Sequence, residues 1–174
     1  SGRFGSTQLT GDLVQSASGV LAVDVDPHAQ DGAGSAAVLA IDGRADLAGR
    51  VAANLLNVQQ LEAGLRSVRI ATAAQGMSLA GLEAAGSAVA RYRLVQGAPG
   101  ELRLGYDVDF ANQGILARTN DNQDALVRHL RDVYRAGALD DGTVRSLLAV
   151  EDTAAYARAM NGLSAELAVD TQMV

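Results

Sequence analysis

The stretch Leu102-Arg103-Leu104-Gly105-Tyr106-Asp107-Val108-Asp109-Phe110 alternates apolar residues with polar or small ones. Successive side chains of a β-strand point to opposite faces, so this stretch predicts a strand with one apolar face. Downstream of Asn120, the apolar residues recur instead at helical spacing and mark one helix face. Those residues are Leu126, Leu130, Val133 and Tyr134. The chain is therefore expected to be mainly β before this switch and α-helical after it.

Further runs of alternating residues lie upstream of Leu102, and glycine-rich turns separate them. The predicted strands cover residues 8–15, 20–26, 38–41, 45–56, 65–73 and 88–95. The stretch 45–56 is expected to be one or two strands with a tight corner at Gly49. Residues 75–86 are small and punctuated by glycine, so they are expected to be irregular. The pattern of strand and turn repeats along the chain without an exact sequence repeat.

A right-handed parallel β-helix satisfies this pattern, because each rung covers the apolar face of the rung before it. Aromatic residues make up only 3% of the 174 residues, which suits thin, regular layers. A β-sandwich is the structural competitor. It should show clearer hairpin turns, and only Asp42-Gly43 has the expected symmetry. We therefore predict a mainly β fold of right-handed parallel β-helix rungs, followed by a C-terminal segment of short helices.

Residues able to cap a helix N-terminus mark where those helices start. Asn120 lies in a polar cluster before the first helix, and Gly137 is expected to end it. Asp140 or Asp141 is expected to cap a second, short helix. Asp152 is expected to cap a third helix that stops at Asn161-Gly162, and a fourth follows. Short amphipathic helices are marginal in isolation, so these helices need a partner surface.

The composition narrows the possible functions. The chain carries a net charge of −6, all 14 basic residues are arginine, and there is no cysteine. An acidic chain without a basic cluster is a poor candidate for binding nucleic acid or anionic lipid. The absence of cysteine excludes disulfides, thiolate metal sites and cysteine nucleophiles. No signal peptide is visible at Ser1, and the start within a strand pattern favours a piece of a longer protein.

Three pairs of residues are of types that carry chemistry: His28 and His129, Asp24 and Asp26, and Asp107 and Asp109. The histidines lack the serine and aspartate of a catalytic triad, so surface positions are expected. The first aspartate pair lacks the glycine and the terminal glutamate of a calcium loop. The second pair shares one strand face, but no second pair or nearby base supports a glycosidase, and solvated charge explains it better.

Two other stretches give no stronger signal. Residues 76–86 lack a lysine and the spacing of a phosphate-binding loop. Arg91, Arg93 and Arg103 form a short basic stripe, and we expect a mixed, solvated face there. No catalytic, cofactor-binding or metal-ligating residue is predicted, and the chain is not expected to be an enzyme.

Several short motifs resemble the C-terminal end of autotransporter passengers. Residues 9–15 and 19–27 resemble a Gly-x-hydrophobic-x-Gln strand followed by Gly-x-Leu-x-Val-x-Val-Asp. Residues 41–51 resemble a Gly-x-Ala-x-Leu-x-Gly-x-Val rung. Residues 68–73 resemble a Tyr-x-Ile-Leu-Thr-Ala strand, with Val68 in the aromatic position.

The helical part continues this resemblance in the same order. Asn122-Gln123, Leu147-Leu148 and residues 161–166 resemble the Asn-Gln … Leu-Ser-Gly-Glu segment that precedes the translocator β-barrel. Ala165 stands where glycine is usual. The ordered series covers nearly the whole chain and is more specific than any one motif.

This resemblance implies a division into two parts. Residues 1–118 would be a passenger-stem β-helix with an autochaperone-like region, and residues 119–174 a helical linker to a translocator β-barrel. Such a structural and secretion module nucleates folding of the passenger at the cell surface of a Gram-negative bacterium, reached through the periplasm, and links it to the outer membrane. The implied partners are the barrel, the upstream passenger rungs and the outer-membrane assembly machinery.

No cofactor, nucleic acid or small-molecule substrate is implied by the same resemblance. Two other functions stay open. An adhesin-type binding module that uses the flank of the β-helix is the main alternative. An enzyme, such as a passenger esterase or peptidase, is the third and has the least support in these residues.

Overall fold

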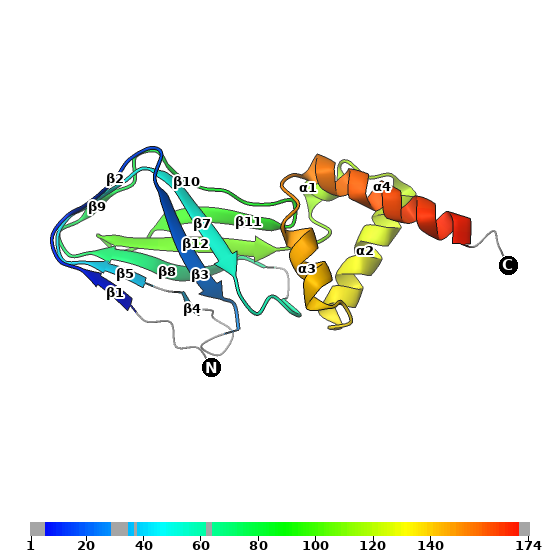
Figure 1. Cartoon of the computed structure of the whole chain (residues 1–174), viewed down its shortest axis with the longest axis horizontal. Coiled ribbons are helices and arrows are strands. Elements are labelled where there is room, and N and C mark those ends of the chain that lie inside the picture. Colours follow the sequence, from blue (N-terminus) through cyan, green and yellow to red (C-terminus); the bar gives the residue numbers. More distant parts are fainter. Residues whose placement is uncertain (1–5, 29–34, 37, 62–63, 171–174) are drawn as a thin grey trace. The chain divides into compact units, whose positions relative to one another are not determined.

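The computed structural model describes residues 6–28, 35, 36, 38–61 and 64–170, with the strands first in the chain and the helices last (Figure 1). The strands are β1 (Ser6–Leu9), β2 (Leu13–Gln15), β3 (Val20–Asp26), β4 (Ser35–Ala36), β5 (Val38–Ile41), β6 (Ala45–Leu47), β7 (Gly49–Leu55), β8 (Arg66–Ala73), β9 (Met77–Ser78), β10 (Leu82–Ala84), β11 (Ala90–Gln96) and β12 (Glu101–Val108). The helices are α1 (Gln113–Leu116), α2 (Asp121–Arg135), α3 (Asp141–Leu148) and α4 (Thr153–Asp170).

The chain forms two compact units, each assembled from several segments. Unit 1 comprises Ser1–Asn57, Leu65–Ala85 and Tyr92–Asp107. Unit 2 comprises Val58–Gly64, Gly86–Arg91 and Val108–Val174. Unit 1 thus contains most of the strands, whereas unit 2 contains all four helices. The division at residue 118 that the resemblance implies stays a prediction.

The strands form three sheets, in the orders β1-β5-β8-β12-β11, β10-β7-β3-β4 and β2-β6-β9. Parallel pairs join β1 to β5, β5 to β8, β2 to β6, β6 to β9, β3 to β7 and β7 to β10. Antiparallel pairs join β8 to β12 and β3 to β4. Most neighbours are therefore parallel, and the antiparallel pairs lie toward the ends of two sheets.

The predicted fold class, a mainly β chain of right-handed parallel β-helix rungs followed by short helices, is wrong. The described residues form a small mixed α/β fold of short parallel and mixed sheets with four helices, and they show neither a β-helix nor a solenoid. Alternation assigns residues to the two faces of a strand, but it fixes neither the partner of that strand nor the direction of pairing. β12 illustrates this, because it runs antiparallel to β8 with a register shift between Leu102 and Arg103.

Small and branched side chains fill the core of unit 1, as the alternation predicts. Its fully buried aliphatic residues include Val25, Ala45, Leu47, Val51, Ile70, Leu102 and Leu104. The predicted corner within residues 45–56 is confirmed, since Ala48 separates β6 from β7. Gly49 makes this corner with a φ of 86°, and a Cβ there would lie 2.4 Å from the carbonyl oxygen of Gly19. Only glycine fits such a position without displacing backbone.

Side-chain caps begin the helices of unit 2, as predicted. Asn120 and Gln123 form a reciprocal capping box at the start of α2. Asp140 and Asp152 accept hydrogen bonds from backbone N–H groups in the first turns of α3 and α4. Gly137, with a φ of 71°, follows the C-terminus of α2, as expected for a helix-ending glycine.

Four features of the secondary structure differ from the prediction. The stretch 8–15, expected to be one strand, contains the end of β1 and the whole of β2, which belong to different sheets. α4 is one helix, although two helices were expected with a break at Asn161-Gly162. A glycine inside a helix costs only about 1 kcal/mol and ends it only when it adopts the left-handed conformation. α1 is not predicted, and β9 and β10 lie in the stretch 75–86 that was expected to be irregular. Pairing with neighbouring strands gives these two short segments their structure, so local composition alone does not reveal them.

Candidate functional site

The two histidines lie at the surface. His28 and His129 are both exposed. The backbone N–H of His28 donates to Oδ1 of Asp26 at 3.0 Å, which closes a turn after β3. This contact of His28 is that of a turn residue.

The aspartates of β3 link neighbouring segments of the sheet. Oδ1 of Asp24 accepts a hydrogen bond from Nδ2 of Asn54 on β7 at 2.8 Å. Oδ2 of Asp26 accepts one from Nδ2 of Asn57 at 2.8 Å. Cross-strand polar pairs of this kind stabilise a sheet. Among the residues that the structure describes, no group of three or more His, Cys, Asp or Glu side chains could hold a metal ion.

Asp107 and Asp109, which share a strand face in the sequence pattern, have different surroundings. Asp107 is half-buried on β12. Asp109 lies beyond the end of that strand, where its Oδ1 accepts a hydrogen bond from the backbone N–H of Ala111 at 2.9 Å. This contact closes the turn that leads into α1, so the carboxylate of Asp109 has a local structural role.

Asn112 is a structurally important residue that the sequence interpretation missed. Its side chain is buried, and its Oδ1 caps α1 by accepting from the N–H groups of Gly114 and Ile115. Its Nδ2 donates to the carbonyl oxygens of Ala88 and Asp109 at 2.9 and 3.0 Å. All of its polar atoms are therefore used within unit 2. An asparagine shortly before the apolar pair Ile115-Leu116 is a capping signal that could have revealed it.

Unit 1 contains a shallow groove of about 500 Å³. Three segments of the chain line it, and most of their residues are small. Arg50 and Glu83 are the charged members of the lining, which comprises Ala17, Ser18, Gly19, Gly49, Arg50, Gly81, Glu83, Ala84 and Ala85. Hydrogen bonds join the backbones across it, from the N–H of Arg50 to Gly19 and from the N–H of Gly49 to Gly81. The close approach of these backbones accounts for Gly49, whereas a Cβ on Gly81 would meet no atom within 4 Å, and no described group points to a ligand.

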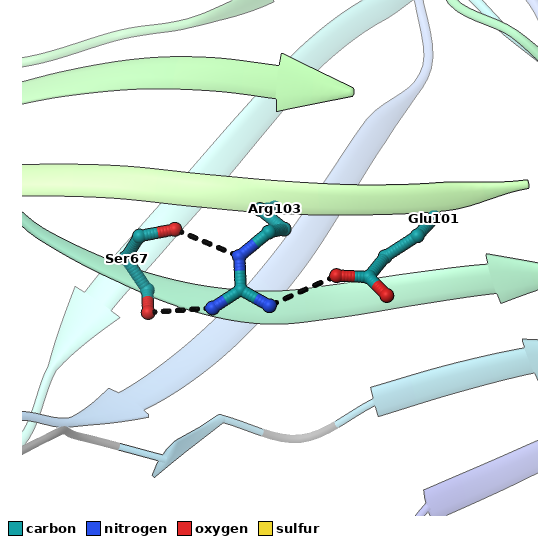
Figure 2. A network of polar contacts seen from close by, with 3 residues as sticks. All are labelled: Ser67, Glu101 and Arg103. Carbon is teal, nitrogen blue, oxygen red and sulfur yellow. Dashed lines mark hydrogen bonds and ion pairs between the residues drawn. The ribbon is translucent and has the colours of Figure 1, made fainter. Parts of the chain in front are cut away.

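Of the predicted stripe of Arg91, Arg93 and Arg103, Arg103 belongs to a cluster of polar contacts. Arg103 on β12 is held by Ser67 and Glu101 (Figure 2). Its Nε and Nη2 donate to Oγ and the backbone oxygen of Ser67 at 2.9 and 3.0 Å. Its Nη1 donates to Oε1 of Glu101 at 2.9 Å. The guanidinium of Arg103 is therefore fixed in position over the neighbouring strand β8.

Register brings another arginine into this cluster. Arg69 on β8 is the direct cross-strand partner of Arg103, so the two side chains share one face of the sheet. Arg69 is exposed, and so is Arg93 on β11. Neither forms an ion pair with any residue in the part of the chain that the structure describes. We call the surface formed by Leu65, Arg69, Arg93, Val95 and Arg103 the arginine face.

The surroundings of two tyrosines of unit 1 raise their pKa values. Burial raises the pKa of Tyr92 to about 12. Burial also raises the pKa of Tyr106, an effect that the charge of Arg66 opposes and the charge of Asp26 reinforces. Both phenols are therefore neutral at physiological pH, and the neutral forms match their role as packing residues.

Comparison of the chain with models of known protein families, with curated proteins and with solved structures finds no match. Among the described residues, no helix is both long enough and apolar enough to cross a membrane. Two surfaces of unit 1 are candidates for binding other chains. One is formed by the strands at the edges of its sheets, and the other is the arginine face.

Proposed function

We propose that this chain is a structural, non-enzymatic module of a bacterial autotransporter, which nucleates folding of the passenger at the cell surface and links it to the outer-membrane translocator. The ordered series of motifs that resembles autotransporter passengers supports this role. The order of the elements also agrees with it, since strands able to pair with further chain come first and helices follow. The helices of unit 2 correspond to the linker segment in this proposal.

The open edges of the three sheets carry the proposal. Among the described residues, β1 and β2 each lie at the edge of a sheet, and β4 pairs with β3 at Val25 and Asp26 alone. An edge strand presents unpaired N–H and C=O groups to an incoming strand. Val14 on β2 and Val20 on β3 are 75% and 53% exposed, so an added segment would also bury apolar surface. Unit 1 therefore offers a ready template on which further extended chain can fold.

A deletion in the full-length secreted protein tests this role. Removal of residues 65–110 takes away the five strands from β8 to β12, and with them part of each of the three sheets. We expect less protein at the cell surface and lower protease resistance of the region upstream. Surface immunolabelling and limited proteolysis of whole cells measure both effects. Normal display and a normally folded upstream region would contradict the proposal.

A finer test changes the edges without changing the fold of the chain itself. Val14→Arg with Val20→Asp places charge at exposed positions, opposite Asp46 and Arg50 respectively, so each new charge faces one of opposite sign and the purified chain should keep its melting temperature. Surface display should fall, because an incoming segment would have to bury these charges. Ala98→Asp, at an exposed position in the turn between β11 and β12, is the matched control and should leave display unchanged. Equal display for all variants would contradict a templating role of these edges.

A further inference from the structure

We propose that the arginine face binds an acidic, partly apolar peptide segment of another protein. This role goes beyond the secretion function and does not depend on it. The face lies within unit 1, on the strands β8, β11 and β12 and on Leu65, which directly precedes β8. Three observations carry the inference: the like-charged pair Arg69 and Arg103, the unneutralised Arg93, and the exposed apolar side chains beside them.

The pairing of Arg69 with Arg103 is unfavourable for the chain on its own. Like charges directly opposite each other on neighbouring strands destabilise a sheet. Glu101 and Ser67 hold the guanidinium of Arg103, so Arg103 has an acidic partner that offsets part of this repulsion (Figure 2). Arg69 has no such acidic partner in the described part of the chain. A carboxylate from outside would relieve this unfavourable arrangement.

Arg93 supplies a second unneutralised positive charge near a flat part of the face. Gly105 lies between its neighbours Ser67 on β8 and Arg93 on β11. A Cβ on Gly105 would come within 3.4 Å of the carbonyl oxygen of Arg93 and of Cδ1 of Leu65. Gly105 is itself buried, and the absence of a side chain there lets Leu65 lie close against the sheet beside Arg93.

The apolar members of the face define the rest of the partner. Leu65 and Val95 are 59% and 37% exposed, and they are two of the four large apolar residues that the described chain leaves exposed. Leu65 shares its face with Arg69, and Val95 shares its face with Arg93, because residues at even spacing along a strand point the same way. An occupant should therefore combine carboxylates with apolar side chains.

The charge of the whole chain separates a peptide from other anions. A net charge of −6 repels extended polyanions such as nucleic acids and sulfated polysaccharides, whose binding depends on many positive contacts. The face offers two unneutralised arginines and an apolar surface, and a polyanion has no use for the apolar part. A short segment with alternating acidic and aliphatic residues matches both features, because its side chains can contact the arginines and the apolar residues together.

Titration of the purified chain with a synthetic peptide of alternating glutamate and valine tests the proposal, with binding measured by calorimetry. We expect saturable binding that weakens as salt is added. Arg69→Gln and Arg93→Gln should each lower the affinity at least about fivefold. Arg44→Gln is the matched control, because Arg44 is an exposed arginine of the same unit that pairs with Asp46, and it should leave the affinity unchanged. The absence of saturable binding, or equal affinity of all variants, would overturn the proposal.

Two further arms separate this role from a structural one and from general anion binding. The melting temperature of the Arg69→Gln variant should equal or exceed that of the wild type, because the substitution removes a like-charged pair. A fall of several degrees would show that Arg69 serves the fold and would overturn the proposal. A peptide with glutamine in place of glutamate should bind at least about fivefold more weakly. A sulfated oligosaccharide that binds as tightly as the acidic peptide would also overturn it, since the occupant would then be a polyanion.

Discussion

Unit 1 and unit 2 are stabilised by different kinds of interaction. Backbone ladders between strands of distant sequence position organise unit 1, and small or branched side chains fill its core. Side-chain caps and buried aromatic rings organise unit 2. The rings of Phe110 and Tyr134 lie 4.5 Å apart between centroids, and Tyr156 is fully buried. Backbone contacts therefore determine the fold of unit 1, whereas individual side chains determine the fold of unit 2.

This difference determines which substitutions each unit tolerates. Where backbones approach closely, even one added methyl group forces strands apart, so the critical residues of unit 1 are glycines. Where one side chain satisfies several backbone groups, the loss of its polar atoms leaves those groups unpaired, so the critical residues of unit 2 are polar. Matched pairs of substitutions within each unit test this contrast.

The largest effect is expected in unit 1, at Gly100 in the turn between β11 and β12. Gly100 has a φ of 76°, and a Cβ there would lie 2.1 Å from the carbonyl oxygen of Ala73. Its own carbonyl accepts a hydrogen bond from the N–H of Ala73 at 2.7 Å. Gly100→Ala should therefore displace the turn from β8. Denaturation by urea should show a loss of about 2–5 kcal/mol, of which about 1–2 reflect the backbone conformation and about 1–3 the clash.

Gly81 provides the control, because it has the same φ of 76° but no atom within 4 Å of the added Cβ. Gly81→Ala should cost only the backbone contribution of about 1–2 kcal/mol. The difference between the two variants measures the close packing of backbones in unit 1. Equal losses would mean that packing at Gly100 relaxes freely. They would contradict the conclusion that close backbone packing is critical in unit 1.

The same contrast explains how much of the fold the sequence predicts. Caps act through residues a few positions apart, so Asn120 and Asp140 indicate the starts of α2 and α3 correctly. Alternation is equally local, and it places β5, β8 and β12 within a few residues. The choice of strand partners depends on contacts between distant segments. A pattern along one strand contains no information about those contacts, and for this reason the predicted architecture is wrong while most of its strands exist.

The sequence likewise predicts only part of the arginine face. The sequence places Arg93 and Arg103 on outward faces of their strands, which the structure confirms. The sequence did not reveal that Arg69 is opposite Arg103, since this depends on the antiparallel register of β8 with β12 and on the shift within it. The groups that neutralise Arg103 also come partly from another strand, through Ser67.

A smaller effect is expected in unit 2, at the hydroxyl of Tyr134. This hydroxyl donates to the carbonyl oxygen of Val58 and accepts from the N–H of Leu61, and both residues are buried. Tyr134→Phe leaves these two backbone groups without their partner while the ring stays in place. The expected loss of stability is about 1–3 kcal/mol, measured by urea denaturation.

Tyr156→Phe is the matched substitution, since Tyr156 is equally buried but its hydroxyl has no hydrogen-bond partner among the described residues. Removal of an unsatisfied buried hydroxyl should leave stability unchanged or raise it slightly. If both tyrosine variants lose the same stability, packing of the rings rather than hydrogen bonding determines the result. That result would contradict the conclusion that side-chain hydrogen bonds stabilise unit 2.

The smallest effect is expected from acid, at the helix starts of unit 2. The hydroxyl and the N–H of Thr143 lower the pKa of Asp140, and the N–H of Ala155 lowers the pKa of Asp152, because these hydrogen bonds favour the charged carboxylates. A lowered pKa in the folded state means that the stabilisation is complete above the unfolded value, about 3.9, and disappears as the pH falls through the folded value. Below about pH 4, the amide resonances of Thr143 and Ala155 should therefore shift in NMR spectra, while the amides within the strand ladders of unit 1 do not follow this step.

Asp140→Asn sharpens this test, because asparagine caps a helix as well as aspartate but does not titrate. The shift at Thr143 should disappear in this variant, while the shift at Ala155 remains. Each carboxylate is exposed, so solvent weakens its contribution, and the global fold should persist through the transition. A shift at Thr143 that persists in Asp140→Asn, or a shift at Ala155 that disappears there, would contradict the assignment of each shift to its own capping carboxylate.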